Sequence, residues 1–477
     1  MINVICSLMV LAANVIINFW LSPYIVKNIG VEDNGFITLA NNFVTYAQLV
    51  AAALNSMAAR FISISYVQKD YKKANLYYNS VFWGNLIITV LFLIPAVFTI
   101  ARLEVMIRIP ENIIFDVKVL FSFVFFNFLL TTGVPNWECG TYIANRLDRS
   151  YIPQMGTALF RCLFLFLIFT VMAPKVYYVG MASSAVTVLL LLFNWYNTHK
   201  LTPELKVFLR PKEMICSKDA IRKLVGSGIW NTISNVGNIL LSGLDLIICN
   251  LFLGAAAMGI LSLSKILPNY MQQLSAAIRG AFAPELTINY AKGDKTAIFR
   301  DMNRAMKLTS IVMTIPIAVI VVLGDKFFQL WVPSQDAELL QILSVLSILG
   351  YMFTSGIQIL YNVFTTVNRV KENAAAMLIS GCISCLITLI FVKFTDFGIY
   401  AVAGVSTVCN LAMTVGSSGI LIFVGFLVKR ILPDGSWPGL IFSAVVLGGI
   451  GLLINIAVIL EKDDRQYLLE WIRSKIS

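Results

Sequence analysis

The stretch GVEDNGFITL at residues 30–39 follows the first long apolar run of the chain, and it decides the fold because it recurs. The second copy, GAAAMGILSL at residues 254–263, follows the seventh apolar run. The two copies are offset by 224 residues, and the same register pairs Asn14 with Asn238, Tyr46 with Tyr270, Gln48 with Gln272 and Asp70 with Asp294. Six runs separate the copies, so both halves should cross a membrane in the same direction. Parallel repeats of this kind are typical of transporters whose ligand site lies between the halves.

The composition requires a membrane around these runs. Of 477 residues, 58% are apolar and 13% are charged, and the mean hydropathy is +0.81. Soluble domains carry about 25% charged residues, whereas a helix that crosses the bilayer needs about 20 mostly apolar ones. We therefore expect an all-α polytopic membrane protein with thirteen apolar runs, at 4–26, 36–59, 80–100, 114–134, 153–173, 176–197, 225–250, 256–280, 308–324, 338–364, 373–392, 398–428 and 438–460.

The loops between the runs predict the orientation. The even-numbered loops from the second to the tenth hold 20 Lys and Arg residues, whereas the odd-numbered loops, together with Lys118 near the start of the fourth run, hold 7. Basic loops stay cytoplasmic, which places the N-terminus in the cytoplasm and explains the net charge of +11 without nucleic acid. The first run lacks a basic leader and carries Asn14 and Asn18, so we expect a span rather than a signal peptide. Gly416–Gly419 interrupts the 398–428 run, which leaves thirteen or fourteen spans, and either side for the C-terminus, open.

The repeat and the spans predict four regions. Residues 1–197 form an N-terminal lobe of six helices, and residues 225–428 form a C-terminal lobe of six. Residues 198–224, rich in Lys and Arg, are the cytoplasmic linker between the lobes, and residues 429–477 add a further helix and a tail.

Three runs carry polar side chains at a spacing of 3.5 residues, which keeps them on one helix face. Such a stripe faces protein or water rather than lipid. Amides and hydroxyls also join helices within membrane bundles, so a purely structural role stays open. The stripes are Asn41, Thr45, Gln48, Ala52 and Asn55 in the second run; Lys265, Asn269, Gln272, Ala276 and Arg279 in the eighth; and Asn231, Asn235, Asn238, Ser242 and Asp245 in the seventh.

Four ionisable residues lie deep in these runs: Arg161, Lys265 and Arg279 against Asp245. Because charge in hydrocarbon is costly, each should face a cavity or a partner. A net cationic cavity would bind phosphate, and the amide stripes would bind hydroxyls. A structural ion pair between Lys265 and Asp245 is the alternative. With one histidine and scattered cysteines, we expect no metal site and no cofactor.

Several stretches together resemble the bacterial oligosaccharide flippases of the polysaccharide transporter family. They are LSPYIVKNIG at 21–30, ALNSMAARFI at 53–62, NRLDRS at 145–150 and SGIWNTI at 227–233. The superfamily of these flippases also includes multidrug extruders and lipid II flippases. The resemblance implies two six-helix lobes around a central V-shaped cavity, with one or two extra C-terminal helices. It also implies transfer of an undecaprenyl-pyrophosphate-linked oligosaccharide to the outer leaflet of the bacterial cytoplasmic membrane by alternating access.

No ATP-binding motif appears in the sequence, so we expect an H⁺ or Na⁺ gradient to drive transport, with Asp245 as the candidate coupling residue. The expected partners are the lipid-linked glycan, membrane lipid and a glycan polymerase or chain-length protein. A multidrug extruder of the same fold is one alternative, although organic cations favour an acidic cavity. A membrane glycan polymerase or glycosyltransferase is another, but the short outer loops offer no catalytic constellation. We therefore expect a transporter rather than an enzyme.

Overall fold

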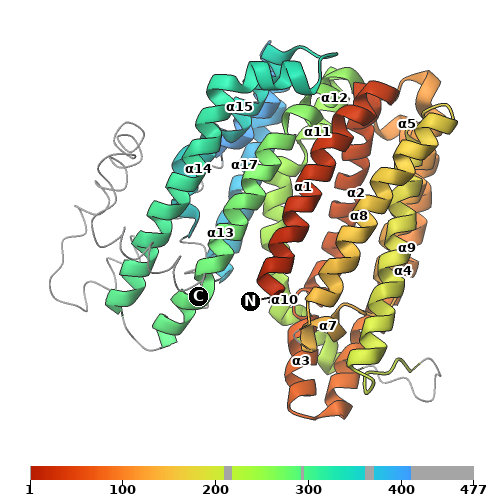
Figure 1. Ribbon diagram of the computed structural model, residues 1–477, viewed down its shortest axis with the longest axis vertical. Helices are drawn as coiled ribbons and strands as arrows, with labels where there is room; N and C mark the ends of the chain where they lie inside the picture. Colours follow the sequence, from red (N-terminus) through yellow and green to blue (C-terminus); the bar gives the residue numbers. More distant parts are fainter. Residues whose placement is uncertain (1, 145, 209–216, 292–294, 360–369, 410–477) are drawn as a thin grey trace.

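The computed structural model describes residues 2–144, 146–208, 217–291, 295–359 and 370–409. Within these ranges the chain is helical and contains no strand, which confirms the all-α fold class. Figure 1 shows the helices side by side, with α3 and α7 at the end that holds the N-terminus and α5 and α12 at the opposite end. We call these the α3–α7 end and the α1–α2 end, because the turn from α1 to α2 lies at the latter.

The described part of the first half of the chain contains ten helical elements. They are α1 (Ile2–Ile29), α2 (Val31–Asn55), α3 (Ala58–Val67), α4 (Tyr71–Ala101), α5 (Leu103–Met106), η1 (Glu111–Ile113), α6 (Ile114–Gly133), α7 (Cys139–Ile143), α8 (Asp148–Val171) and α9 (Tyr177–Leu201).

The second half is more interrupted in its described part. It contains α10 (Lys218–Asn238), the π-helical turn η3 (Ile239–Gly243), α11 (Asp245–Leu253), α12 (Ala255–Ser264), α13 (Ile266–Ala291), α14 (Lys295–Trp331), α15 (Ala337–Thr354), η4 (Ile357–Ile359) and α17 (Val370–Phe394). The predicted run 256–280 is therefore divided at Lys265. The run 438–460 and most of the run 398–428 lie outside the described residues, as does the predicted region 429–477. The lobe boundaries stay predictions.

Eight helical stretches in the described ranges are long and apolar enough to cross a membrane, and two shorter helices are also apolar. Many large apolar side chains point outward, such as Trp20, Ile94 and Leu330, which are 74%, 74% and 85% exposed. Lipid covers such surfaces, because helices satisfy their own backbone hydrogen bonds in hydrocarbon. The chain is a multi-pass membrane protein.

Polar side chains begin several helices outside the apolar stretches. Asp70 accepts a hydrogen bond from the Lys73 backbone N–H at 3.0 Å where α4 starts. Asp336 does the same at the start of α15, where it accepts from Glu338 at 3.0 Å. Such caps satisfy backbone donors that the first turn leaves free.

The repeated glycines meet in space. Gly30 and Gly254 precede α2 and α12 with φ values of 100° and 96°, which glycine adopts easily. The second glycine of each copy lies at the contact between these helices: a Cβ on Gly35 would stand 2.9 Å from the Gly259 Cα. A Cβ on Gly259 would stand 2.4 Å from the Val31 carbonyl oxygen. The repeat therefore allows α2 and α12 to approach closely at the α1–α2 end.

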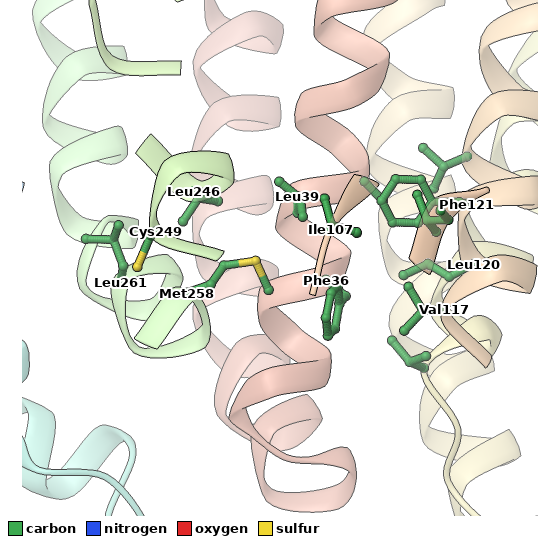
Figure 2. Close-up of a cluster of buried hydrophobic side chains, with 14 of the residues drawn as sticks. Phe36, Leu39, Ile107, Val117, Leu120, Phe121, Leu246, Cys249, Met258 and Leu261 are labelled. Carbon is green, nitrogen blue, oxygen red and sulfur yellow. The ribbon is translucent and has the colours of Figure 1, made fainter. Parts of the chain in front are cut away.

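The largest buried cluster lies around this contact and joins both halves of the chain (Figure 2). Phe36 and Leu39 of α2 lie between Met258 and Leu261 of α12 on one side and Phe121 of α6 on the other. Burial of such side chains is worth about 1.5–3 kcal/mol each in water; within a membrane, close packing replaces much of that gain. The α1–α2 end is thus closed by tightly packed apolar side chains.

Polar contacts also join the halves at the α1–α2 end. Fully buried Asn250 of α11 accepts from the Arg108 backbone N–H at 2.7 Å and donates to its carbonyl at 3.0 Å. Trp331 of α14 donates its indole N–H to the Phe19 carbonyl of α1 at 2.8 Å. Because these groups are satisfied only across the contact between halves, they help to hold this end closed.

Candidate functional site: two polar cavities along α2

The larger cavity has a volume of about 680 Å³ and lies toward the α3–α7 end. We call it the amide cavity. It is enclosed by α2, α4, α9, α10 and the segment from the end of α6 to the start of α7. Its lining residues are Thr45, Gln48, Leu49, Ala51, Ala52, Asn55, Ser56, Asn85, Thr131, Thr132, Val134, Pro135, Asn136, Trp137, Glu138, Leu191, Asn194, Asn235, Asn238 and Ile239.

Five polar residues of the predicted stripes line this cavity. Thr45, Gln48 and Asn55 come from α2, and Asn235 and Asn238 come from α10. Gln48, Asn235 and Asn238 are exposed to it, and their side chains have no hydrogen-bond partner within the part of the chain that the structure describes. Exposed amides of this kind can bind a polar ligand.

One pair of amides stiffens the wall of the cavity. Asn55 of α2 donates to the Asn85 carbonyl oxygen at 3.0 Å, and Asn85 of α4 donates back to Asn55 at 2.9 Å. This reciprocal bond joins α2 to α4 and is the structural role that the sequence left open for Asn55. Each amide still has a second N–H and a second lone pair for a ligand.

Sequence reasoning missed other lining residues. Asn85 and Asn194 are isolated amides in apolar helices, and no stripe marked them. Asn136, Trp137 and Glu138 lie between the spans that end at Gly133 and begin at Asp148. The Glu138 side chain is open to the cavity, but burial among the surrounding residues raises the pKa of its carboxyl group. A loop carboxylate gives no periodic signal, so only the fold shows that it lies inside.

The smaller cavity, of about 240 Å³, continues along α2 toward the α1–α2 end. We call it the ion-pair pocket. It contains the predicted residues Lys265, Asn269 and Gln272 of the second half, together with Thr38 and Asn42 of α2. Asn42 takes the place that the stripe gave to Asn41, which is exposed and lines neither cavity.

Lys265 forms an ion pair with Asp245, whose side chain is 5% exposed. Both residues lie at helix breaks. Asp245 follows the π-helical turn η3, where the Gly243 carbonyl accepts from the Tyr46 hydroxyl of α2 at 2.5 Å. Lys265 follows α12, and Pro268 has no N–H to offer the Ser264 carbonyl, which accepts from the Ser344 hydroxyl at 2.7 Å instead. The ion pair therefore lies next to two backbone carbonyls that accept hydrogen bonds from side chains of other helices.

Arg161 lies apart from both cavities, between α8 and α1. Its Nη2 donates to the Asn18 carbonyl oxygen at 2.6 Å, while its buried Nε has no hydrogen-bond partner in the ranges that the structure describes. Among the described residues no carboxylate pairs with Arg161, and its charge interacts with the Tyr270 side chain of α13. Three of its five N–H donors, those on Nη1 and Nη2 that are not bonded to Asn18, make no hydrogen bond within the described chain.

Arg279 is placed differently again. It donates to the Ser275 hydroxyl at 2.7 Å and to Gln358. The three predicted cations therefore do not line one shared cavity: Lys265 is paired in the ion-pair pocket, Arg161 lies between α8 and α1, and Arg279 is bonded to side chains of the second half.

Helices across a bilayer, two halves in matched register and polar cavities between them define a multi-pass membrane protein with a transporter-like fold. The family model described as "Polysaccharide biosynthesis protein" matches residues 1–287, more than half of the chain, so the protein belongs to that family. This confirms the resemblance to the polysaccharide transporters.

The chain is similar over its length to one curated protein, "Uncharacterized membrane protein EpsK" of Bacillus subtilis (strain 168). The identity is 25% over 499 aligned residues, which covers 99% of this chain and 98% of that protein.

Solved transporters have the same fold. An inward-facing multidrug resistance MATE family transporter of the MOP superfamily aligns with a TM-score of 0.64 and 14% identity, over 88% of this chain and 93% of that one. The lipid II flippase MurJ in an inward closed conformation aligns with a TM-score of 0.56 and 15% identity, over 95% and 97%.

Proposed function

We propose that the protein is a flippase that moves a polyprenyl-pyrophosphate-linked oligosaccharide across the bacterial cytoplasmic membrane. One observation carries the proposal: amides without a hydrogen-bond partner among the described residues line a cavity of about 680 Å³ inside a membrane protein of a polysaccharide biosynthesis family. Hydroxyl-rich sugars cannot cross hydrocarbon without hydrogen bonds. The amide cavity supplies those bonds during passage.

The pyrophosphate is assigned to Arg161. A guanidinium with open N–H groups binds phosphate oxygens through charge-assisted hydrogen bonds, and Asn18 fixes its orientation. Because Arg161 lies between α8 and α1 rather than in the amide cavity, the charged group would bind at the edge of the site. The polyprenyl tail would then remain in lipid.

With the N-terminus in the cytoplasm, the α1–α2 end faces outward and the amide cavity lies toward the cytoplasm. The state described here would then load substrate from inside. Separation of α2 from α12 at the Gly35–Gly259 contact, with closure at the α3–α7 end, would release it outside. The moving bodies in this proposal are the lobes 1–197 and 225–428, joined by the linker 198–224.

The ion pair is the proposed coupling site. Asp245 and Lys265 neutralise each other in the pocket between α2 and the second half. A proton or Na⁺ that binds Asp245 would release Lys265. The ion pair that holds the two helix breaks together would then be lost. An ion gradient could thereby bias the two conformations, since a ligand shifts an equilibrium by its differential affinity.

Reconstituted vesicles test the proposal. A fluorescent oligosaccharide on polyprenyl pyrophosphate, placed in one leaflet, should become accessible to a quencher in the other. Arg161→Gln keeps a polar side chain but shortens it and removes the charge, and should slow transfer about 10–100-fold, as expected when charge-assisted hydrogen bonds worth about 1.5–3 kcal/mol are lost.

The control is Arg102→Gln, at an exposed arginine where α4 ends, which should leave transfer unchanged. Unimpaired transfer by Arg161→Gln would remove Arg161 from the site. If the wild-type vesicles export an organic cation but no lipid-linked glycan, the multidrug extruder is the correct function.

A further inference from the structure

The chemistry of the amide cavity limits the glycan that can enter it. Its lining includes seven carboxamide side chains, four hydroxyl side chains and the indole of Trp137. Among the described lining residues, Glu138 is the one ionisable side chain, and it is acidic.

Carboxamides suit neutral sugars. Each amide both donates and accepts, as each sugar hydroxyl does, so the two can pair without any net charge. The flat face of an indole offers apolar contact to the C–H face of a sugar ring, with its N–H free to bond a hydroxyl. Gln48, Asn235 and Asn238 are exposed to the cavity and lack partners in the described chain.

An acidic sugar fits poorly. A carboxylate taken out of bulk water needs a cation or several strong donors. In this cavity it would instead meet Glu138. While Glu138 is ionised, like charges repel more strongly in a protein interior than in water, and the burial that raises the pKa of Glu138 also makes ionisation of a second carboxyl group beside it costly. The cations of the site stand elsewhere, because Arg161 lies by α1 and Lys265 is bonded to Asp245.

We propose that the amide cavity selects an uncharged oligosaccharide, in which the sugars that occupy the cavity carry no carboxylate or sulfate group. Glu138 is the residue that sets this preference. The inference rests on the proposed flippase function and adds the substrate class: the lipid-linked head divides into a charged pyrophosphate at Arg161 and a neutral glycan among the amides.

The experiment compares two substrates in the same vesicles. Both are pyrophosphate-linked tetrasaccharides of equal size, one neutral and one in which a single glucose is replaced by glucuronic acid. The wild-type protein should move the neutral substrate at least about tenfold faster, the factor that corresponds to 1.4 kcal/mol. Glu138→Gln should narrow that ratio, and Glu138→Lys should abolish or reverse it, whereas Glu111→Lys at an exposed position of η1 should not change it.

A binding measurement separates this inference from the proposed function. In an Asn235→Cys variant, the neutral tetrasaccharide without its lipid should slow maleimide labelling of the cavity, and the acidic one should not. Equal protection by both glycans, protection by neither, or equal transfer of both lipid-linked substrates, would overturn the preference. Absence of all transfer together with selective protection would overturn the flippase function and leave the preference supported.

Discussion

The two halves of the chain align at an offset of 224 residues, but they differ at two positions that are charged in the second half only. In the first half, α1 and α2 run unbroken through Leu21 and Asn41. The positions 224 residues later are Asp245 and Lys265, an ion pair that lies at two helix breaks. The glycines that let α2 and α12 approach are shared by both copies. The duplicated scaffold thus keeps its packing glycines, whereas at these two positions only the second half carries an ion pair.

This difference has an energetic reason. The two charges of a buried ion pair attract each other but lose their hydration, so the pair contributes little net stability. Removal of one partner costs much more free energy, because the other charge then stays buried without compensation. The two breaks at Asp245 and Lys265 and the buried pair between these residues are therefore poor devices for stability. Among the described residues the first half has no break at the equivalent positions, Leu21 and Asn41, which fits the coupling role that we propose for Asp245.

The largest effect should come from breaking the pair. Lys265→Met leaves Asp245 buried without its cation, and we expect a loss of about 3–5 kcal/mol in the free energy of unfolding, measured by denaturant titration in detergent. The double variant Lys265→Met with Asp245→Leu should recover most of that loss. Asn41→Met, at the equivalent exposed position of the first half, should change stability by less than about 0.5 kcal/mol. Equal losses at both positions would mean that the halves do not differ in this way.

The second largest effect should come from the glycine contact between α2 and α12, which both copies of the repeat share. Gly259→Ala places a Cβ within 2.4 Å of the Val31 carbonyl oxygen, which is backbone and cannot rotate away. We expect the overpacked contact to cost about 1–3 kcal/mol of unfolding free energy. Gly156→Ala in α8 meets no atom within 4 Å and should be neutral or stabilising. A stable Gly259→Ala protein with normal transfer would show that close approach of α2 and α12 is dispensable.

The smallest effect on stability should come from replacing the proline that follows the break between α12 and α13. Pro268 has Val44 as its counterpart in unbroken α2. Pro268→Ala restores an N–H that can bond the Ser264 carbonyl, at the expense of the bond from Ser344. We expect stability to change by less than about 1 kcal/mol, because one hydrogen bond replaces another, while glycan transfer falls severalfold as Lys265 shifts.

Pro95→Ala is the control for that variant, since Pro95 lies on the exposed side of α4 and lines neither cavity. It should leave transfer unchanged. If Pro268→Ala transports as well as Pro95→Ala does, the break at Lys265 serves packing rather than transport.

Much of this site could be predicted from α2. The stripe of Thr45, Gln48 and Asn55 lines the amide cavity, as the spacing of 3.5 residues suggested. The same spacing failed at Asn41, because the face turns by one residue and Asn42 lines the ion-pair pocket instead. Helix period identifies a polar face well near the middle of a straight helix and less well toward its end.

The cations show the limit of sequence reasoning. Period and depth identified Arg161, Lys265 and Arg279 as costly in lipid, but they carry no information about which helix lies opposite. Glu138 shows the converse: nothing in the loop sequence distinguished it from a solvated surface carboxylate.

The sequence by itself determined that the chain spans a membrane, that it is duplicated and that several helices present polar faces. These properties follow from composition and period, which act locally along the chain. Only the tertiary structure decided that Lys265 bonds Asp245, that Arg161 lies by Asn18 and that Glu138 faces the amides. Those outcomes depend on contacts between helices far apart in sequence, and the free energy of a buried charge depends on such contacts.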